Sequence, residues 1–464
     1  MEYRIEKDSL GAVKVPFDAY WGAQTQRAIE NFPISGIKAH PSFVWASAQI
    51  KKAACITNRD LGLIPKDQAG AIIAVCDEII AGELRDQFVV DVFQAGAGTS
   101  HNMICNEVIA NRANELLGGH KGDYKPINPN DTVNMSQSTN DFIPTAIRIA
   151  CLQLAHELIA KLEGLRIVFA EKSEQFDAIV KSGRTHLQDA VPIRLGQEFS
   201  GYEMTIARHI GWIKDAAYEL TEIGLGGTAV GTGLNCHPDY RANVAAYLAK
   251  QTGFEIKPAR NYFEAMQSMA PFVKVSGELR NLAQDLSRIA NDFRLLASGP
   301  KTGLAELLLP ARQPGSSIMP GKINPVMAEM LNMVCFAAIG NDDSILWAAQ
   351  AGQMELNVMM PLIAFKLPDS LSILTNAIDA FTKYCVVGIE ADANRCKMFA
   401  ESSAAVVTAL TPILGYMKAA EIVKKSYAEN LTVREILLRE KLVEPHKLDE
   451  ILELIKLTEP GIHN

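Results

Sequence analysis

Apolar residues recur every three or four positions over several long stretches of the chain. The longest series alternates steps of three and four residues without a break. Its members are Phe272, Val275, Leu279, Leu282, Leu286, Ile289, Phe293 and Leu296. Such a seam predicts one long helix that packs against other helices in a left-handed bundle.

Two further stretches carry a similar stripe, and they lie at residues 141–169 and 367–385. Their apolar positions are Ile147, Cys151, Leu154, Leu158, Leu165 and Phe169, followed by Leu367, Leu371, Leu374, Ile378, Phe381 and Cys385. Glycines and prolines at residues 224–233 and 299–325 separate the helical stretches, so the helices can lie antiparallel. We therefore predict a mainly all-α protein with a central bundle of long helices. Narrow seams often continue across a subunit boundary, which favours an oligomer.

The segments before and after these helices have a different character. Residues 1–140 contain shorter helical patterns, such as Asp67 to Ile80, between loops rich in Gly, Asn and Pro. After residue 395 the helices are short, and the pattern Thr432 to Glu435 predicts a capping box. Strand signals are few. We expect an N-terminal mixed or helical domain at 1–140, the long-helix domain at 141–395 and a small helical domain at 396–464.

Composition excludes several kinds of partner. The 464 residues carry a net charge of −8, and no block of Lys and Arg stands out, which argues against nucleic acid and anionic membranes. The first residues lack the apolar core of a signal peptide, and no uncharged stretch is long enough to span a bilayer. Eight scattered cysteines without a Cys-x-x-Cys pair argue against a disulfide scaffold or a zinc site. A cytoplasmic protein fits these features.

Four polar clusters interrupt the apolar pattern, at residues 96–107, 128–141, 183–189 and 315–325. The last of them reads Gly315-Ser316-Ser317-Ile318-Met319-Pro320-Gly321-Lys322-Ile323-Asn324-Pro325. This stretch is too polar for a core and too rich in Gly and Pro for a helix. We predict a movable loop that brings Ser, Lys and Asn side chains to an anionic substrate.

Each cluster alone also has a structural interpretation. The polar side chains of Thr99–Ser100 and Ser138–Asn140 could cap the helices that follow them. His186 could be a buried core residue, and Arg184 and Asp189 could form a structural ion pair.

Together the clusters favour a catalytic interpretation. They supply many neutral hydrogen-bond donors together with the cation Lys322, which alone would be taken for a solvated surface charge. They contain no phosphate-binding loop and no nucleophile elbow. This set suits a reaction in which negative charge grows on a small carboxylate, where each donor can contribute roughly 3 kcal/mol.

The four clusters resemble, in order and in sequence, the motifs of the aspartase/fumarase superfamily. The resemblance rests on Gly98-Thr99-Ser100, Ser138-Thr139-Asn140-Asp141, Gly183-Arg184-Thr185-His186 and the 315–325 loop, and it extends over nearly the whole chain. It implies three mostly helical domains and a homotetramer whose long helices form a common core. It further implies active sites shared by three subunits, a small dicarboxylate substrate and no cofactor. Activation by a divalent cation is known in the family, but no residue cluster places such a site here.

The resemblance also implies roles for four residues of the loop. Ser316 would be the general base that removes a proton from Cβ, with its alkoxide stabilised by loop amides and Lys322. Ser317 would donate to the resulting enediolate, or aci-carboxylate. The α-carboxylate would be held by Lys322, Asn324 and Thr185.

The remaining matches would surround the other end of the substrate. By resemblance, the β-carboxylate would be held by Thr99, Ser138 and Thr139. Asn140 and His186 would lie near the leaving group at Cα. The predicted substrate-binding residues are Thr99, Ser100, Ser138, Thr139, Asn140, Thr185, His186, Ser317, Lys322 and Asn324, and the catalytic residues are Ser316 and His186.

Within the family the resemblance points to two reactions. Asn128, where fumarases have histidine, and Ser138-Thr139-Asn140 are similar to aspartases, whereas Trp21–Arg27 and Gly226–Gly231 are similar to fumarases. The motifs nearest the reaction favour elimination of ammonia from L-aspartate. Hydration of fumarate to L-malate is the alternative.

Two positions depart from the patterns of both branches. Ile104 stands where relatives usually have Asn, and Met360 stands where aspartases have Glu and fumarases Arg. Either position could tune the recognition of the leaving group. A helical scaffold without catalytic activity is a third possibility, but it predicts decay of the 315–325 loop, which is intact.

Overall fold

The computed structural model describes residues 2–462, which are mainly helical, as predicted. Contacts divide the chain into two compact units. Unit 1 contains the residues up to Ala160, Gly211–Ala283 and Cys335–Thr375. Unit 2 contains Lys161–Ile210, Gln284–Val334 and the residues from Asn376 onward. The predicted division at residues 140 and 395 stays a prediction.

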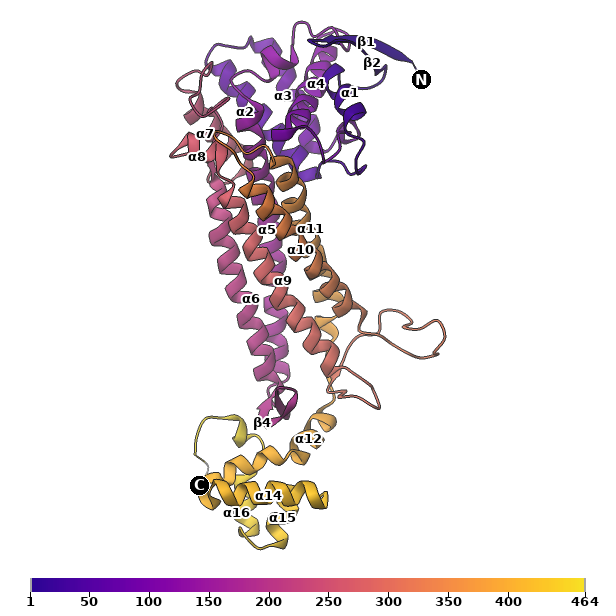
Figure 1. Cartoon of the computed structure of the whole chain (residues 1–464), viewed down its shortest axis with the longest axis vertical. Helices are drawn as coiled ribbons and strands as arrows, with labels where there is room; N and C mark the ends of the chain where they lie inside the picture. Colours follow the sequence, from indigo (N-terminus) through magenta and orange to yellow (C-terminus); the bar gives the residue numbers. More distant parts are fainter. Residues whose placement is uncertain (1, 463–464) are drawn as a thin grey trace. The chain divides into compact units, whose positions relative to one another are not determined.

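Long helices that lie side by side dominate the fold (Figure 1). They are α5 (Thr139–Gln175), α6 (Leu195–Tyr218), α9 (Ala270–Leu296), α10 (Val326–Gln350) and α11 (Met360–Tyr384). The seam predicted between Phe272 and Leu296 falls within α9, and its eight members are at most 5% exposed. The stripes predicted on α5 and α11 are buried as well, so the long-helix bundle is confirmed.

Helix α5 is long and apolar enough to cross a membrane by length and composition alone. However, 83% of its most apolar window is buried inside the protein. This burial is what the core helix of a soluble protein shows, because its apolar side chains contact neighbouring helices rather than lipid.

Unit 1 also contains shorter helices and two small sheets. The antiparallel hairpin β1 (Tyr3–Asp8) and β2 (Gly11–Pro16) was not predicted. Strands β5 (Glu222–Ile223) and β6 (Lys257–Pro258) pair in parallel. The shorter helices are α1 (Ala23–Asn31), α2 (Pro41–Asp60), α3 (Lys66–Ala81), α4 (Thr99–Leu116), α7 (Tyr240–Thr252) and α8 (Tyr262–Gln267). The predicted helix from Asp67 to Ile80 is therefore confirmed as α3.

Unit 2 contains two further strand pairs. The antiparallel hairpin β3 (Val180–Thr185) and β4 (Gln188–Arg194) carries the third polar cluster. Strands β7 (Leu307–Leu308) and β8 (Glu390–Ala391) pair antiparallel. The loop from residue 309 to residue 325 follows β7 and precedes α10.

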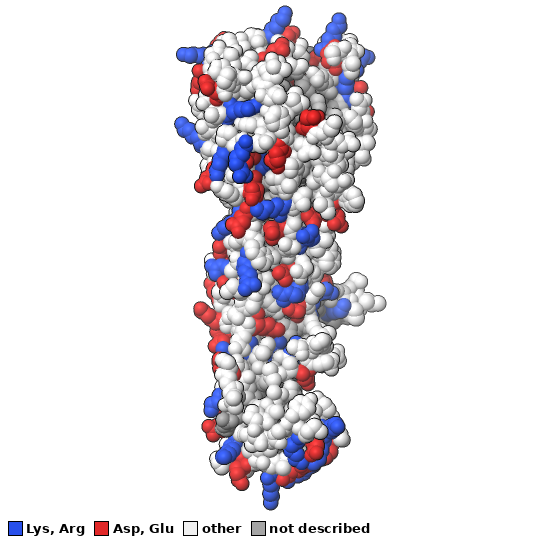
Figure 2. All heavy atoms as spheres, turned by 60° about the vertical axis from the view of Figure 1, so that its left-hand side comes forward, with Lys and Arg blue, Asp and Glu red and all other residues white. Residues whose placement is uncertain are grey.

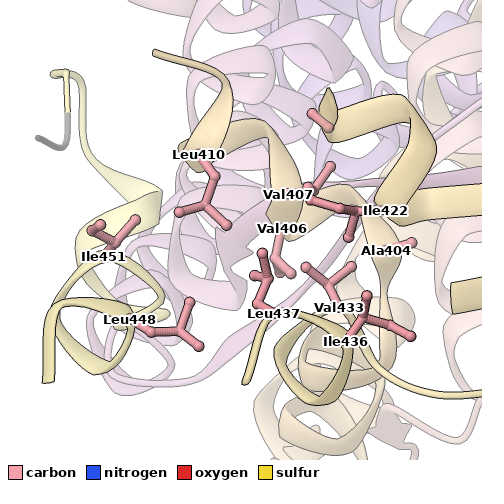
Figure 3. Close-up of a cluster of buried hydrophobic side chains, with 11 residues drawn as sticks. Ala404, Val406, Val407, Leu410, Ile422, Val433, Ile436, Leu437, Leu448 and Ile451 are labelled. Atoms are coloured by element: carbon pink, nitrogen blue, oxygen red, sulfur yellow. The ribbon is translucent and has the colours of Figure 1, made fainter. Parts of the chain in front are cut away.

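The C-terminal part of unit 2 has its own small apolar core (Figure 3). Its helices are α12 (Ala393–Ser402), α13 (Thr411–Leu414), α14 (Tyr416–Glu429), α15 (Val433–Arg439) and α16 (Pro445–Ile451). The capping box predicted at Thr432 and Glu435 is present at the start of α15. Leu410, Ile436 and Leu448 are fully buried in this core, so the short helices are held together by side-chain packing.

Candidate active site

The predicted site residues fall into two groups, one in each compact unit. Unit 1 holds Thr99, Ser100, Ser138, Thr139 and Asn140. Unit 2 holds Thr185, His186, Ser316, Ser317, Lys322 and Asn324. Each group can be described by its own contacts.

The N-terminal ends of α4 and α5 bring the first two polar clusters together. Thr99 and Ser100 open α4, and Asn102 follows within the first turn. Asn102 Nδ2 donates to Thr139 Oγ1, at the start of α5, over 3.1 Å. Thr99 is exposed, whereas Ser100 is buried. Two helix N-termini therefore lie close together, and their partial positive charge suits an anion such as a carboxylate.

Gly98 allows this close approach. Its φ of +85° lies in the left-handed region, and a Cβ added there would lie 2.9 Å from the Ile143 side chain of α5. Any other residue would push the start of α4 away from α5.

The start of α5 is fixed by a reciprocal cap. Ser138 Oγ accepts from the Asn140 amide over 3.2 Å, and Asp141 Oδ1 accepts from the Ser138 amide over 2.8 Å. Asp141 Oδ2 also accepts from the amides of Gly226 and Thr228, each over 2.9 Å. Burial raises the pKa of Asp141 to about 6, although these amides and Lys51 favour the charged carboxylate. The capping interpretation is thus confirmed for Ser138, which still lies at the helix N-terminus.

Asn140 is oriented by the same loop. Its Nδ2 donates to the Ala229 carbonyl over 2.8 Å. Its Oδ1 is therefore free to accept, for example from an ammonium group on a substrate.

The ammonium group of Lys51 is fully buried near Thr139, and it was not among the residues predicted from the sequence. Lys51, on α2, donates from Nζ to Asn102 Oδ1 over 2.9 Å and lies 4.1 Å from the centre of the Phe142 ring. The available signal was a lysine within the small and apolar run Ala46–Cys55. A neighbouring lysine, Lys52, concealed this signal because it points outward to Asp77.

In unit 2, the β3–β4 hairpin presents Thr185 and His186 at its turn. His186 and Leu187 have φ values of 55° and 57°, so both central residues of the turn are left-handed. Gly and Asn adopt this conformation readily. For His or Leu, holding the backbone there costs on the order of 1–2 kcal/mol per residue. The side chains of Thr185 and His186 are exposed, so His186 is not a buried core residue of the chain. Arg184 forms its ion pair with Glu306 rather than with Asp189.

The predicted loop is closed at its neck by two hydrogen bonds. The Gly315 amide donates to the Lys322 carbonyl over 2.7 Å, and Asn324 Nδ2 donates to the Gly315 carbonyl over 2.7 Å. A Cβ on Gly315 would lie 2.6 Å from the Lys322 oxygen, so the neck requires glycine there. Figure 1 shows the loop standing out from the start of α10. Ser317 and Lys322 are exposed on it.

The Ser316 hydroxyl accepts two backbone hydrogen bonds within this loop. Its Oγ accepts from the Met319 amide over 2.9 Å and from the Ile318 amide over 3.3 Å. Two amides aimed at one hydroxyl oxygen stabilise negative charge on that oxygen. The arrangement can therefore support an alkoxide, the form in which a serine acts as a base.

Within residues 2–462, no group of three or more His, Cys, Asp or Glu side chains is placed to hold a metal ion. The two groups of residues offer hydrogen-bond donors to an anion, and the amides at Ser316 favour the ionised form of its hydroxyl.

Comparisons with known proteins agree with this description. A sequence model of the family described as lyase matches residues 11–340, and a model of the fumarase C C-terminus matches residues 406–459. Aspartate ammonia-lyase of Bacillus subtilis is 49% identical over 99% of this chain and 97% of its own length. Fumarate hydratase class II of Halobacterium salinarum is also 49% identical, over 99% of this chain and 98% of its own length.

A solved structure extends the likeness to three dimensions. The cobalt-bound fumarate lyase:delta crystallin of Brucella melitensis superimposes with a TM-score of 0.96 at 47% identity, over 99% of this chain and all of that chain. The matches cover nearly the whole chain in both sequence and structure. The chain therefore belongs to the lyase family of the aspartase/fumarase superfamily.

Proposed function

We propose that the protein is an aspartate ammonia-lyase, which converts L-aspartate reversibly to fumarate and ammonia. The observation that carries the proposal is the hydrogen bonding of Ser316 Oγ to the amides of Ile318 and Met319. The 49% identity to an aspartate ammonia-lyase over nearly the full length of both chains supports the choice of substrate. Basic and acidic side chains are intermixed over the face in Figure 2, which argues against a polyanionic partner such as nucleic acid on that face.

In the proposed reaction, the Ser316 alkoxide takes the proton from Cβ of aspartate. The electron pair of the broken C–H bond moves into the β-carboxylate and forms an enediolate. Hydroxyls of Thr99, Ser138 and Thr139, at the ends of two helices, stabilise the added charge. The electrons then return to form the Cα–Cβ double bond as the C–N bond breaks, and ammonia leaves on the face opposite the base.

The other residues hold and enclose the substrate. Lys322, Asn324 and Thr185 bind the α-carboxylate, and Ser317 donates to the enediolate. Asn140 accepts from the α-ammonium through Oδ1, and His186 lies beside the leaving group. Closure of the loop that carries Ser316 excludes water and completes the donor set.

We further infer a homotetramer whose active sites combine residues of three subunits. Helix α10 supports this inference because it is apolar around much of its circumference. Phe336 and Trp347 on this helix are 60% and 69% exposed in the single chain. Large exposed apolar side chains on one long helix are typical of a subunit interface. Light scattering on purified protein tests the inference, and a monomer would contradict it.

We infer that the enzyme works in the cytoplasm without a cofactor. Cysteines 55, 76, 105, 151, 236, 335, 385 and 396 are all free thiols, which suits a reducing compartment. Activity that survives exhaustive dialysis against a chelator tests the second part of this inference.

Class II fumarate hydratase is the second candidate. The fumarate hydratase of Halobacterium salinarum supports it, because this relative is 49% identical to the chain, as is the aspartate ammonia-lyase of Bacillus subtilis. One assay separates the candidates. The purified protein is offered L-aspartate and L-malate in parallel, and fumarate is followed by its ultraviolet absorbance. Fumarate and free ammonia from aspartate support the proposal, whereas fumarate from malate alone supports the fumarase. A protein that forms fumarate from neither substrate would agree with a helical scaffold.

A further inference from the structure

The buried ammonium group of Lys51 determines the orientation of the amides around it. Its Nζ has three N–H donors and no acceptor, so each polar atom that it contacts is an oxygen. These atoms are Asn102 Oδ1 at 2.9 Å, Asn134 Oδ1 at 3.0 Å and Gln137 Oε1 at 2.9 Å. The three N–H donors thus match three amide oxygens. Rotating any of these amides by about 180° would place an NH2 group against the ammonium, so their orientations are fixed.

This orientation reaches Thr139 through Asn102. Because Lys51 takes the Asn102 oxygen, the Asn102 nitrogen faces the other way. Its two hydrogens go to Asn134 Oδ1 and Thr139 Oγ1, each over 3.1 Å. Thr139 Oγ1 is therefore an acceptor on its buried side, and its own hydrogen points to another partner.

We propose that Lys51 is a positioning residue for the elimination reaction: it acts through Asn102 to make the Thr139 hydroxyl a hydrogen-bond donor toward the substrate β-carboxylate. The inference rests on the proposed function, in which Thr139 stabilises the charge that grows on that carboxylate. Lys51 itself is fully buried and touches no substrate.

The surroundings of Lys51 fit this role. The ionisable groups that favour its charge are Cys105 on α4, Asp141 on α5 and Cys76 on α3, and burial still lowers the pKa of Lys51 to about 7. Loss of its proton would leave two N–H donors for three oxygens, so the amide orientations would no longer be fully determined. The three acceptors offset the cost of burying the charge, and at the same time they fix the direction in which each amide faces.

The variant Asn102→Asp separates the two ends of this relay. An aspartate has almost the same shape and keeps a partner for Lys51, but it has no N–H to give to Thr139. The Thr139 hydroxyl would then donate to the carboxylate introduced at position 102 instead of the substrate. We expect kcat to fall by about 100-fold, the loss typical of removing one such donor, with the fold and assembly unchanged.

A double-mutant cycle with Thr139→Val excludes a simple charge effect. If position 102 acts through the Thr139 hydroxyl, Asn102→Asp has little further effect once that hydroxyl is absent. If the new carboxylate merely repels the substrate, the two losses multiply. Multiplying losses would overturn the proposal, and so would an Asn102→Asp variant with wild-type kcat.

Lys51→Met gives the second arm of the test, with Lys52→Met as its matched control. Lys52 is the next residue on α2 and pairs with Asp77 at the surface. Lys51→Met should lower kcat in a Thr139-dependent way, whereas Lys52→Met should leave kcat and KM unchanged. If Lys51→Met does not assemble, as gel filtration would show, Lys51→Gln takes its place, because the Asn102→Asp cycle tests only the step from Asn102 to Thr139. Wild-type kcat in an assembled variant at position 51 would overturn the role of Lys51.

The outcome also distinguishes this inference from the proposed function. A wild-type protein that forms fumarate only from malate would refute the aspartase proposal, and the cycle would then be run with malate. An active wild type with multiplying losses would refute the positioning role alone. A wild type without activity on either substrate would refute both.

Discussion

Arg184 and Glu306 form a two-point ion pair, with Arg184 Nη1 and Nη2 each 2.9 Å from a carboxylate oxygen of Glu306. Glu306 is fully buried and also lies 3.3 Å from the ammonium of Lys181. Arg184 directly precedes Thr185 and His186, so the pair anchors the strained turn that presents both residues. The buried carboxylate thereby connects the stability of unit 2 to the proposed binding of the α-carboxylate.

The first prediction concerns this anchor. Glu306→Gln leaves Arg184 without its buried counter-charge and leaves Lys181 with Glu198 as its acidic partner. Breaking a buried ion pair in this way typically costs about 3–5 kcal/mol. We expect a clearly lower melting temperature and a raised KM, because the turn that carries Thr185 is less well held. Thermal unfolding and steady-state kinetics measure both effects.

Glu203→Gln is the matched control for that variant. Glu203 pairs with Arg166 over 2.8 Å in a partly exposed ion pair of the same unit, and solvent-screened pairs contribute at most about 1 kcal/mol. If Glu306→Gln melted at the same temperature as Glu203→Gln, the buried pair would have no anchoring role.

The second prediction concerns the acid sensitivity of unit 1. His101 stacks on Phe43 with ring centres 4.2 Å apart, and its Nε2 lies 3.0 Å from Ser47 Oγ. Burial, assisted by the charge of Lys51, lowers the pKa of His101 to about 3. In the unfolded chain the imidazole binds a proton near its ordinary pKa of about 6.5. Protons therefore favour the unfolded chain between these two values.

As the pH falls below about 6.5, His101 should remove about 1.4 kcal/mol of stability per pH unit. His101→Gln lacks the titrating group, so the stability difference between this variant and the wild type should change with that slope between pH 6.5 and 5. Denaturant titration at a fixed protein concentration measures it. His237 is partly exposed, so His237→Gln is the control and should keep the wild-type dependence of stability on pH. The prediction would be contradicted if His101→Gln also kept the wild-type dependence.

The third prediction concerns the exposed cation of the loop. Lys322→Met removes the charge that we assign to the α-carboxylate, so KM for aspartate should rise at least tenfold and kcat should fall. Lys301→Met removes a charge from the neighbouring exposed loop and should leave both constants unchanged. An unaltered KM in Lys322→Met would exclude this lysine from the site.

The fourth prediction tests whether different subunits contribute to one site. Ser316→Ala and Thr139→Val should each be nearly inactive alone. Co-expressed, they should form mixed tetramers in which some sites receive an intact Ser316 and an intact Thr139 from different chains. With random mixing, activity should return to about a quarter of the wild-type value. No recovery in verified mixed tetramers would mean that both residues of a site come from the same chain.

Helices could be predicted where their apolar spacing was regular. The seam from Phe272 to Leu296 is uninterrupted, so its helix follows from periodicity alone. The β3–β4 hairpin could not be predicted, because its strands are short and polar and its turn is His186–Leu187 rather than Asn-Gly.

The site could be predicted only where its residues form contiguous motifs. Ser316 and Lys322 share one loop, and their neighbours in sequence are also their neighbours in space. Lys51 and Glu306 differ, since each acquires its role from partners on other elements. Lys51 reaches Asn102 and Asn134 across the fold, and Glu306 reaches Arg184 over 122 positions of sequence. Tertiary contacts of this kind leave no periodic signal.

The most direct measurement follows fumarate and ammonia from L-aspartate with the wild-type protein and with Ser316→Ala, both shown to be assembled. Equal amounts of the two products from the wild type, and none above background from the variant, are the expected result. An assembled Ser316→Ala protein that still released substantial fumarate would contradict the assignment of the proton-abstracting group.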